Sequence, residues 1–348
     1  MVITTRAGVA DGAVDALRER LERRGWRTVS TVRGHRRVVG CFGDGAAGDA
    51  DELRGHADVE SVSEWSRPWR LASHDAAAQV GTTPVRIGSA PGAVVGGAAL
   101  AIIAGPCSVE GLSLLRAAAR AVRECGAMAL RGGAFKPRTS PYDFQGLGRE
   151  GLEQLAAVRR EFGLPVVTEV MDPRQVEIVA AHADVLQVGA RNMQNYALLA
   201  ELGRVGRPVL LKRGFASTIA ELLLAAEHIM ARGNRDVILC ERGMRTFEQS
   251  TRFTLDVSAI PVVHRETHLP VIVDPSHAAG DAALVPALAF AAIAAGADGL
   301  IVEVHARPEL ARSDRAQALT PAAFDQLMRG VARFAAAAGR TMATDARS

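Results

Sequence analysis

From residue 99 onward, short apolar runs alternate with longer segments of helical character, eight times in succession. Each run is continuously apolar, as expected for a strand that is covered on both faces of a parallel sheet. Eight strand–helix units in about 240 residues fit a TIM barrel, for which ~250 residues are typical. We therefore predict an α/β fold with a TIM (β/α)8 barrel over residues 99–340. The predicted strands are 100–104, 128–131, 165–169, 185–188, 208–212, 237–240, 270–274 and 299–303.

An open, doubly wound sheet is the alternative arrangement of alternating strands and helices. Such a sheet is expected to carry the sequence G-x-G-x-x-G after its first strand. The first predicted strand here is followed by AGPCSVEG, which lacks that glycine spacing. The barrel is therefore the favoured architecture.

The N-terminal part of the chain, residues 1–65, has a different pattern. Short strand candidates and two helical stretches follow one another in the order β-α-β-β-α-β, which is the split, ferredoxin-like arrangement. This part contains no cluster of nucleophilic or metal-ligating residues, so we interpret it as a regulatory or assembly domain. Residues 66–98 are predicted to be a linker that ends in a β-hairpin around Pro91 and Gly92.

Composition excludes several classes of protein. The length of 348 residues predicts two domains, and the net charge of +3 is too small to indicate a nucleic-acid partner. No apolar run reaches the ~20 residues of a bilayer span, and the N-terminus does not resemble a signal peptide. The four cysteines form no CxxC pairs, which predicts a reducing, cytoplasmic location.

The C-terminal end of every predicted barrel strand carries a polar or ionisable residue. Active sites of TIM barrels form at this end, so eight such positions together indicate a site rather than solvated loops. One set is cationic and predicts that more than one anionic group is bound, because arginine matches phosphate and carboxylate in a bidentate manner. Its members are Arg131, Lys136, Arg138, Arg191, Lys212 and Arg242.

A second set has the side chains of a metal centre. Cys107, His277 and Glu303 follow the first, seventh and eighth strands, and Asp314 lies downstream of the eighth. Taken alone, Cys107 is more typical of a buried core thiol. The first and eighth strands are neighbours in a closed barrel, however, so these side chains are expected to converge. A thiolate, an imidazole and two carboxylates suit a divalent transition metal.

Lysine is rare in this chain. Of its 41 basic residues only Lys136 and Lys212 are lysines, and the others are arginines. Lysine is a compact charge whose pKa shifts on burial, whereas arginine is planar and remains charged. The two lysines could be chance survivors on the surface, but their neighbours, FKPRTS and LLKRGF, favour a chemical role.

Several long motifs resemble those of a known family. GPCSVE, LRGGAFKPRTSPYDFQGLG, GARNMQN, LLKRG, ILCERG, VDPSHAAG and GLIVEVH are similar to the motifs of 3-deoxy-D-arabino-heptulosonate 7-phosphate (DAHP) synthases. The resemblance covers residues from about 85 to 335 and extends in layout to the subgroup with an N-terminal ferredoxin-like regulatory domain. These enzymes are transferases. They catalyse the first step of the shikimate pathway, which leads to chorismate and the aromatic amino acids. They condense phosphoenolpyruvate with erythrose 4-phosphate and water and release phosphate.

The resemblance implies roles for individual residues. The metal ligands would be Cys107, His277, Glu303 and Asp314, for a divalent ion such as Mn, Fe, Co or Zn. The phosphoenolpyruvate-binding residues would be Arg131, Lys136, Ala190, Arg191, Lys212 and Arg242. The erythrose 4-phosphate-binding residues would be Lys136, Pro137, Arg138 and Thr139. Beyond the resemblance, we predict three catalytic residues: Lys136 as donor to the developing alkoxide, and Glu169 and His305 near the attacking water.

Two other functions are compatible with parts of this pattern. A 3-deoxy-manno-octulosonate 8-phosphate synthase would share the barrel, but it resembles a K-A-N-R-S loop where this chain has Lys136-Pro137-Arg138-Thr139-Ser140. A catalytically silent regulatory partner of a chorismate mutase would not need Cys107 or Asp314. The family also implies a homo-oligomer, dimeric or tetrameric, and a chorismate mutase as a candidate partner.

Overall fold

The computed structural model describes residues 1–348 except 44, 47, 78–80, 89–92 and 343–348. The chain divides into two compact units, which are residues 1–83 with 266–268, and residues 84–265 with 269–348. The segment 66–98, predicted as a linker, is therefore divided between the two units. Within the described ranges, no helix combines the length and the apolarity that a membrane crossing requires.

The first unit has the predicted ferredoxin-like order of elements. They are β1 (Val2–Thr5), α1 (Asp11–Arg23), β2 (Arg27–Arg33), β3 (Arg36–Phe42), α2 (Asp49–Arg54) and β4 (Val59–Ser63), followed by the short helix η1 (His74–Ala76). The strands form one antiparallel sheet in the order β2-β3-β1-β4. Leu17 and Leu21 lie one turn apart on α1 and pack with Ile3 and Val39 in a buried core. This unit therefore has a hydrophobic core of its own.

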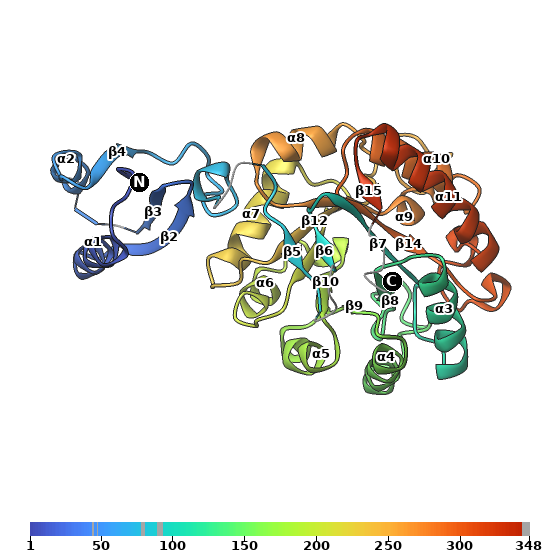
Figure 1. Cartoon of the computed structure of the whole chain (residues 1–348). Coiled ribbons are helices and arrows are strands. Elements are labelled where there is room, and N and C mark those ends of the chain that lie inside the picture. Colours follow the sequence, from blue (N-terminus) through green and yellow to red (C-terminus); the bar gives the residue numbers. More distant parts are fainter. Residues whose placement is uncertain (44, 47, 78–80, 89–92, 343–348) are drawn as a thin grey trace. The chain divides into compact units, whose positions relative to one another are not determined.

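The second unit is a closed barrel of eight parallel strands, which confirms the predicted fold (Figure 1). Its strands are β7 (Ala99–Gly105), β8 (Ala129–Arg131), β9 (Val166–Glu169), β10 (Val185–Val188), β11 (Val209–Lys212), β12 (Val237–Glu241), β13 (Val271–Val273) and β14 (Gly299–Glu303). The barrel closes where β14 pairs in parallel with β7, from Gly299 opposite Ala101 to Glu303 opposite Gly105. Strands one and eight are thus neighbours, as the metal-site prediction required.

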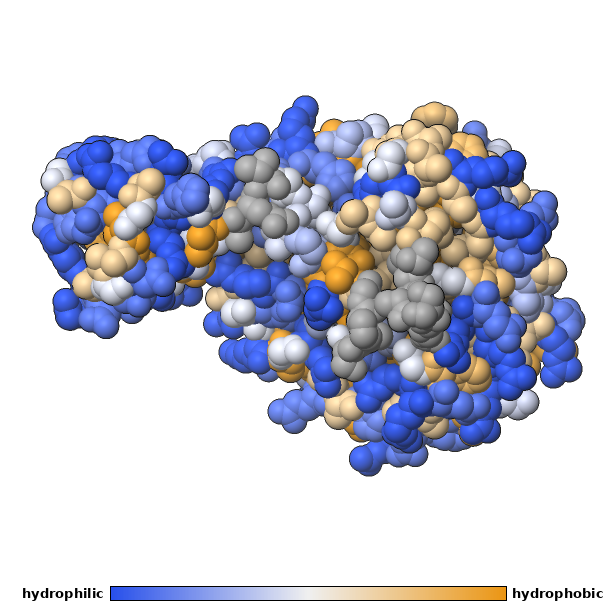
Figure 2. All heavy atoms as spheres, viewed as in Figure 1, coloured by the Kyte–Doolittle hydropathy of each residue, from blue (hydrophilic) through white to orange (hydrophobic). Residues whose placement is uncertain are grey.

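Helices surround the barrel and connect successive strands. The α-helices are α3 (Leu112–Glu124), α4 (Arg149–Phe162), α5 (Val176–His182), α6 (Tyr196–Leu202), α7 (Ile219–Met230), α8 (Ala259–Glu266), α9 (Pro275–Ala279), α10 (Val285–Ala294) and α11 (Pro321–Ala337). Short 3-10 helices are η2 (Pro173–Gln175), η3 (Ala190–Asn192), η4 (Pro308–Leu310) and η5 (Arg315–Gln317), and a short strand β15 (Thr341–Met342) pairs with β7. Figure 2 shows an apolar area over α10 and α11, where Phe334 is partly exposed.

A small hairpin joins the core at one end of the barrel. Strands β5 (Val85–Arg86) and β6 (Val94–Val95) pair antiparallel, as predicted, while the expected turn at 91–92 lies outside the described residues. Val85 and Val95 belong to the same buried cluster as Ala101, Ala129 and Val185, which are near the starts of their strands. The hairpin therefore covers the N-terminal end of the barrel, and the opposite end carries the accessible cavity.

Candidate active site

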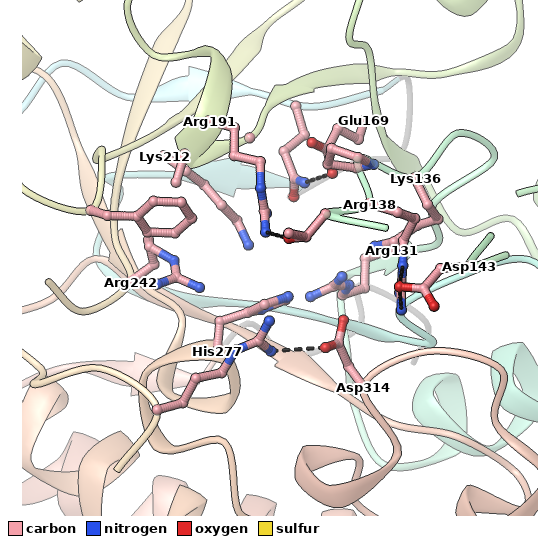
Figure 3. A pocket seen from close by; sticks show the side chains of 17 residues that line it. Arg131, Lys136, Arg138, Asp143, Glu169, Arg191, Lys212, Arg242, His277 and Asp314 are labelled. Carbon is pink, nitrogen blue, oxygen red and sulfur yellow. Dashed lines mark hydrogen bonds and ion pairs between the residues drawn. The ribbon is translucent and has the colours of Figure 1, made fainter. Parts of the chain in front are cut away.

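A cavity of about 130 Å³ opens at the C-terminal ends of the barrel strands (Figure 3). Its walls come from the ends of β8 to β12 and from segments that follow β8 to β14, as expected for a TIM-barrel active site. The side chains are mostly charged. The lining residues are Arg131, Lys136, Pro137, Arg138, Thr139, Asp143, Glu169, Gln187, Gly189, Ala190, Arg191, Lys212, Phe215, Arg242, Arg252, His277 and Asp314.

The four predicted metal ligands converge at the floor of this cavity. One ligand atom from each of Cys107, His277, Glu303 and Asp314 lies within 4.8 Å of the other three. The Cys107 Sγ lies 2.9 Å from Oδ2 of Asp314, and the His277 Nε2 lies 3.2 Å from Oε1 of Glu303. Asp314 reaches the cluster from a backbone in the left-handed conformation, with φ of 49°. This donor set can hold a divalent transition metal ion.

The hydrogen bonds around His277 fit such an ion. The Nδ1 of His277 lies 2.7 Å from Oδ2 of Asp274, and this carboxylate fixes the proton on Nδ1 and leaves the Nε2 lone pair free. Burial lowers the pKa of His277 to about 4, so the ring is neutral near pH 7. Oε1 of Glu303 is buried and accepts no hydrogen bond from the described residues. Two acceptor atoms thus face each other where a cation would satisfy both.

Lys136 contacts the thiol side of the cluster. Its Nζ lies 2.9 Å from the Cys107 Sγ and 3.2 Å from the Cys107 carbonyl oxygen, and the side chain is buried. Burial alone would lower the pKa of Lys136, but Cys107 and Glu169 outweigh it and raise the pKa. Burial raises the pKa of the Cys107 thiol to about 12. A Cβ on Gly133 would come within 2.8 Å of Lys136 Cδ, so glycine gives this side chain its space.

Two of the cavity's cations are neutralised by carboxylates. Arg131 NH2 lies 3.3 Å from Oε1 of Glu303, and Lys212 forms a buried ion pair with Asp274. Burial alone would raise the pKa of Asp274, but His277 and Lys212 outweigh it and hold the pKa well below its ordinary value. The carboxylate of Asp274 therefore orients both a candidate metal ligand and a candidate substrate-binding lysine.

Two other cations have neutral hydrogen-bond partners. Arg191 NH2 donates to the Thr139 hydroxyl at 3.3 Å, and Arg242 NH1 donates to the Gly243 carbonyl at 3.5 Å. Their positive charge is therefore left for a bound anion, and the guanidinium fork suits phosphate or carboxylate. Arg138 pairs instead with Asp143 at 3.2 Å.

Glu169 lies across the cavity from the group of Cys107, His277, Glu303 and Asp314, which we call the metal-type cluster (Figure 3). Its Oε2 accepts a hydrogen bond from Gln187 Nε2 at 3.3 Å, while Oε1 is buried and has no partner among the described residues. A Cβ on Gly189 would lie 2.1 Å from Oε1, so glycine is needed to admit the carboxylate. The free oxygen is therefore available to a ligand in the cavity.

His305 is placed differently from the other predicted residues. It is buried, with Nε2 3.7 Å from Oε2 of Glu110, and its Nδ1 accepts a hydrogen bond from the Arg307 amide. It does not line the described cavity. Cys107 and Glu303 are also buried and do not line the cavity, but they belong to the metal-type cluster.

The sequence interpretation missed residues that support this site. Gln187 donates to Glu169, and Asp274 orients His277. Arg213, the residue after Lys212, donates to both Glu241 and Asp256 at 2.9 Å. A polar Gln187 within the apolar strand VLQV was a signal that could have been noticed. Arg252, which donates to Asp314 Oδ1 at 2.8 Å, lies in a loop whose sequence gave no such signal.

Comparison with known proteins assigns the chain to a family. Residues 82–335 match the model of the DAHP synthetase I family. A phospho-2-dehydro-3-deoxyheptonate aldolase of Thermotoga maritima is 47% identical over 304 residues, which cover 87% of this chain and 88% of the relative. A 2-dehydro-3-deoxyphosphooctonate aldolase of Nitratidesulfovibrio vulgaris is 35% identical over 231 residues, covering 61% of this chain and 84% of that protein.

Solved structures agree with the sequence comparison. The crystal structure of the Thermotoga maritima DAHP synthase superposes with a TM-score of 0.76 at 42% identity and covers 98% of both chains. A truncated form of the same enzyme matches 79% of this chain and 99% of its own, with a TM-score of 0.72 and 44% identity. Since the family model spans most of the chain and the resemblance includes the barrel that carries the cavity, the chain belongs to the DAHP synthetase I family.

Proposed function

We propose that the chain condenses phosphoenolpyruvate with erythrose 4-phosphate and water to give DAHP and inorganic phosphate. The observation that carries this proposal is a single cavity in which a four-residue metal-type cluster faces arginines whose charge is left for an anion. The 47% identity to the phospho-2-dehydro-3-deoxyheptonate aldolase of Thermotoga maritima supports the same reaction.

Phosphoenolpyruvate has two anionic groups, and the cavity has cations to match. Arg131, Arg191, Lys212 and Arg242 bind the phosphate and carboxylate and hold the enol carbon in attack geometry, next to Ala190. Erythrose 4-phosphate binds along the segment Lys136-Pro137-Arg138-Thr139. The hydrogen bond between Thr139 and Arg191 joins the two subsites.

The reaction needs an activated aldehyde and a positioned water. Cys107, His277, Glu303 and Asp314 would hold a divalent ion such as Mn, Fe, Co or Zn, which when bound would supply a Lewis acid for the aldehyde. C3 of phosphoenolpyruvate forms a bond to the aldehyde carbon, water adds at C2, and phosphate leaves when the C2–O bond breaks. Lys136 stabilises the new alkoxide as a proton or hydrogen-bond donor. The free oxygen of Glu169 orients the water.

Phosphate release from the two substrates tests this function directly. We expect release with phosphoenolpyruvate and erythrose 4-phosphate, and loss of release after exhaustive chelation with reductant held constant. Faster release with arabinose 5-phosphate would instead identify an octulosonate synthase, which the lower identity of 35% to such an enzyme makes the weaker alternative. Absence of release with either sugar phosphate would indicate a silent partner protein.

The first unit is proposed to regulate or assemble the enzyme rather than to catalyse. Its core is separate, and the truncated Thermotoga maritima form aligns over 79% of this chain. We expect deletion of residues 1–65 to leave condensation active and to abolish inhibition of the full chain by tyrosine or phenylalanine. Initial rates of both proteins with each amino acid test this prediction.

Three results would change that assignment. If neither amino acid slows the full chain, the unit serves assembly alone. The number of chains in the oligomer should then fall when residues 1–65 are deleted. If the truncated protein keeps the inhibition, the sensor lies in the barrel. If truncation abolishes condensation while circular dichroism shows a folded barrel, part of the active site lies in residues 1–65.

A further inference from the structure

One aromatic ring lies among three arginines from the two loops that follow β10 and β12. Phe215 follows β11 and lines the cavity. The guanidinium carbons of Arg191, Arg242 and Arg245 lie 5.3, 5.0 and 5.7 Å from the centre of its ring. Each distance is within the ~6 Å over which a cation is attracted to an aromatic face. The Phe215 ring therefore contacts the cations that follow β10 and β12.

A second ring backs the first. Phe253 stacks on Phe215 with the ring centres 4.9 Å apart and the planes 6° from parallel. Arg242 is also 4.1 Å from the centre of the Phe253 ring. The backbone holds this arrangement, because the Arg245 amide donates to the Phe215 carbonyl at 2.6 Å and Met244 pairs with Thr254. The stacked pair is thus fixed to the loop that carries Arg242.

The chemistry of a ring differs from that of a carboxylate at such a position. Converging guanidinium groups repel one another, and a carboxylate would reduce the repulsion but would occupy N–H donors, as Glu241 and Asp256 do at Arg213. An aromatic face attracts the cation through its quadrupole and leaves the N–H donors at the edge of the guanidinium plane free. Arg242 is buried, so its charge is poorly solvated before an anion arrives, and burial lowers its pKa.

We propose that Phe215, with Phe253 stacked on it, is a positioning residue for anion recognition. Its ring faces hold Arg191 and Arg242 apart and oriented, with their N–H donors directed to the phosphate or carboxylate of the substrate. The inference rests on the proposed function, because it assigns these arginines to phosphoenolpyruvate. It predicts that the electron density of the ring, and not only its size, sets the affinity for this substrate.

A fluorination series at position 215 separates ring electrons from ring size. Phenylalanine, 4-fluorophenylalanine and pentafluorophenylalanine differ little in shape, while the negative potential of the ring face falls along the series. We expect the Kd of phosphoenolpyruvate, titrated into the full-length protein without sugar phosphate, to rise stepwise and to reach about tenfold for the pentafluoro ring. Inorganic phosphate is the second probe and should follow the same order.

Kinetics and substitution variants complete the test. We expect KM for phosphoenolpyruvate to rise along the series while kcat at saturation and KM for erythrose 4-phosphate change less than about threefold. Phe215→Tyr, which keeps an electron-rich ring, should bind like the wild type, and Phe215→Leu should bind at least as weakly as the pentafluoro protein. Phe334, which stacks on Phe290 in the outer helices, receives the same fluorinated residues as a matched control.

The outcomes distinguish this inference from the proposed function. If the wild type binds phosphoenolpyruvate and releases phosphate but the fluorination series is flat, the Phe215 inference is overturned and the function stands. Weak binding by Phe215→Leu together with a flat series assigns the ring a purely space-filling role, which also overturns it. If the wild type neither binds phosphoenolpyruvate nor releases phosphate, the proposed function itself fails.

Discussion

Replacing Lys136 with arginine is expected to lower turnover by at least about 100-fold, which is the low end of the contribution of a positioned proton donor. The ammonium of Lys136 is buried between the sulfur and the carbonyl oxygen of Cys107, and its stem passes Gly133. The longer, planar guanidinium cannot enter this space without displacing the cluster, and it cannot present a compact charge to a single oxygen. Steady-state phosphate release measures the effect.

Two further measurements make the Lys136 result decisive. Arg149→Lys, an exchange of the opposite kind at an exposed position on α4, should retain full turnover. Thermal unfolding should show that Lys136→Arg is folded at the assay temperature. Turnover near that of the wild type in a folded Lys136→Arg protein would show that the ammonium group has no special role.

Changing Cys107 to serine should remove most of the bound divalent metal and lower turnover by about 100-fold or more. Loss of outer-shell partners alone typically costs 10–100-fold, so loss of a direct ligand should cost at least as much. The hydroxyl is a harder and less readily ionised ligand than the thiol, and it would face the same Asp314 and Lys136 that now surround the sulfur.

Metal content gives a readout that does not depend on activity. We expect elemental analysis of purified Cys107→Ser to give a substoichiometric value under conditions where the wild type binds about one ion per chain. Cys125→Ser is the matched control, because Cys125 caps the C-terminal end of α3 and is not part of the metal-type cluster. Equal metal content and equal turnover in Cys107→Ser and the wild type would remove Cys107 from the ligand set.

The barrel and most of the cavity follow from local sequence patterns. Each strand is a continuous apolar run, and a polar residue directly after such a run, like Lys212 or Arg242, is carried to the shared C-terminal end by chain geometry. Cys107, His277 and Glu303 could be grouped for the same reason, since closure of the barrel makes strands one and eight adjacent.

Partners that depend on tertiary packing could not be found in this way. Phe215 has the same sequence signature as any loop phenylalanine, and its role depends on three arginines that lie 24 residues before it and 27 and 30 residues after it. His305 follows a strand like the other predicted site residues, but its side chain is buried beside Glu110 and does not line the cavity. Position at a strand end predicts nearness to the site, whereas the direction of the side chain depends on packing.

The left-handed backbone at Asp314 has a consequence for the evolution of this chain. Outside glycine such a conformation costs about 1 kcal/mol, and in the described part of the chain Asp314 is the one non-glycine residue that adopts it. Glycine at position 314 would relieve this backbone strain. That exchange would delete a carboxylate of the metal-type cluster. Asp314 thus marks a position at which a relaxed backbone and a complete metal-type cluster require different residues.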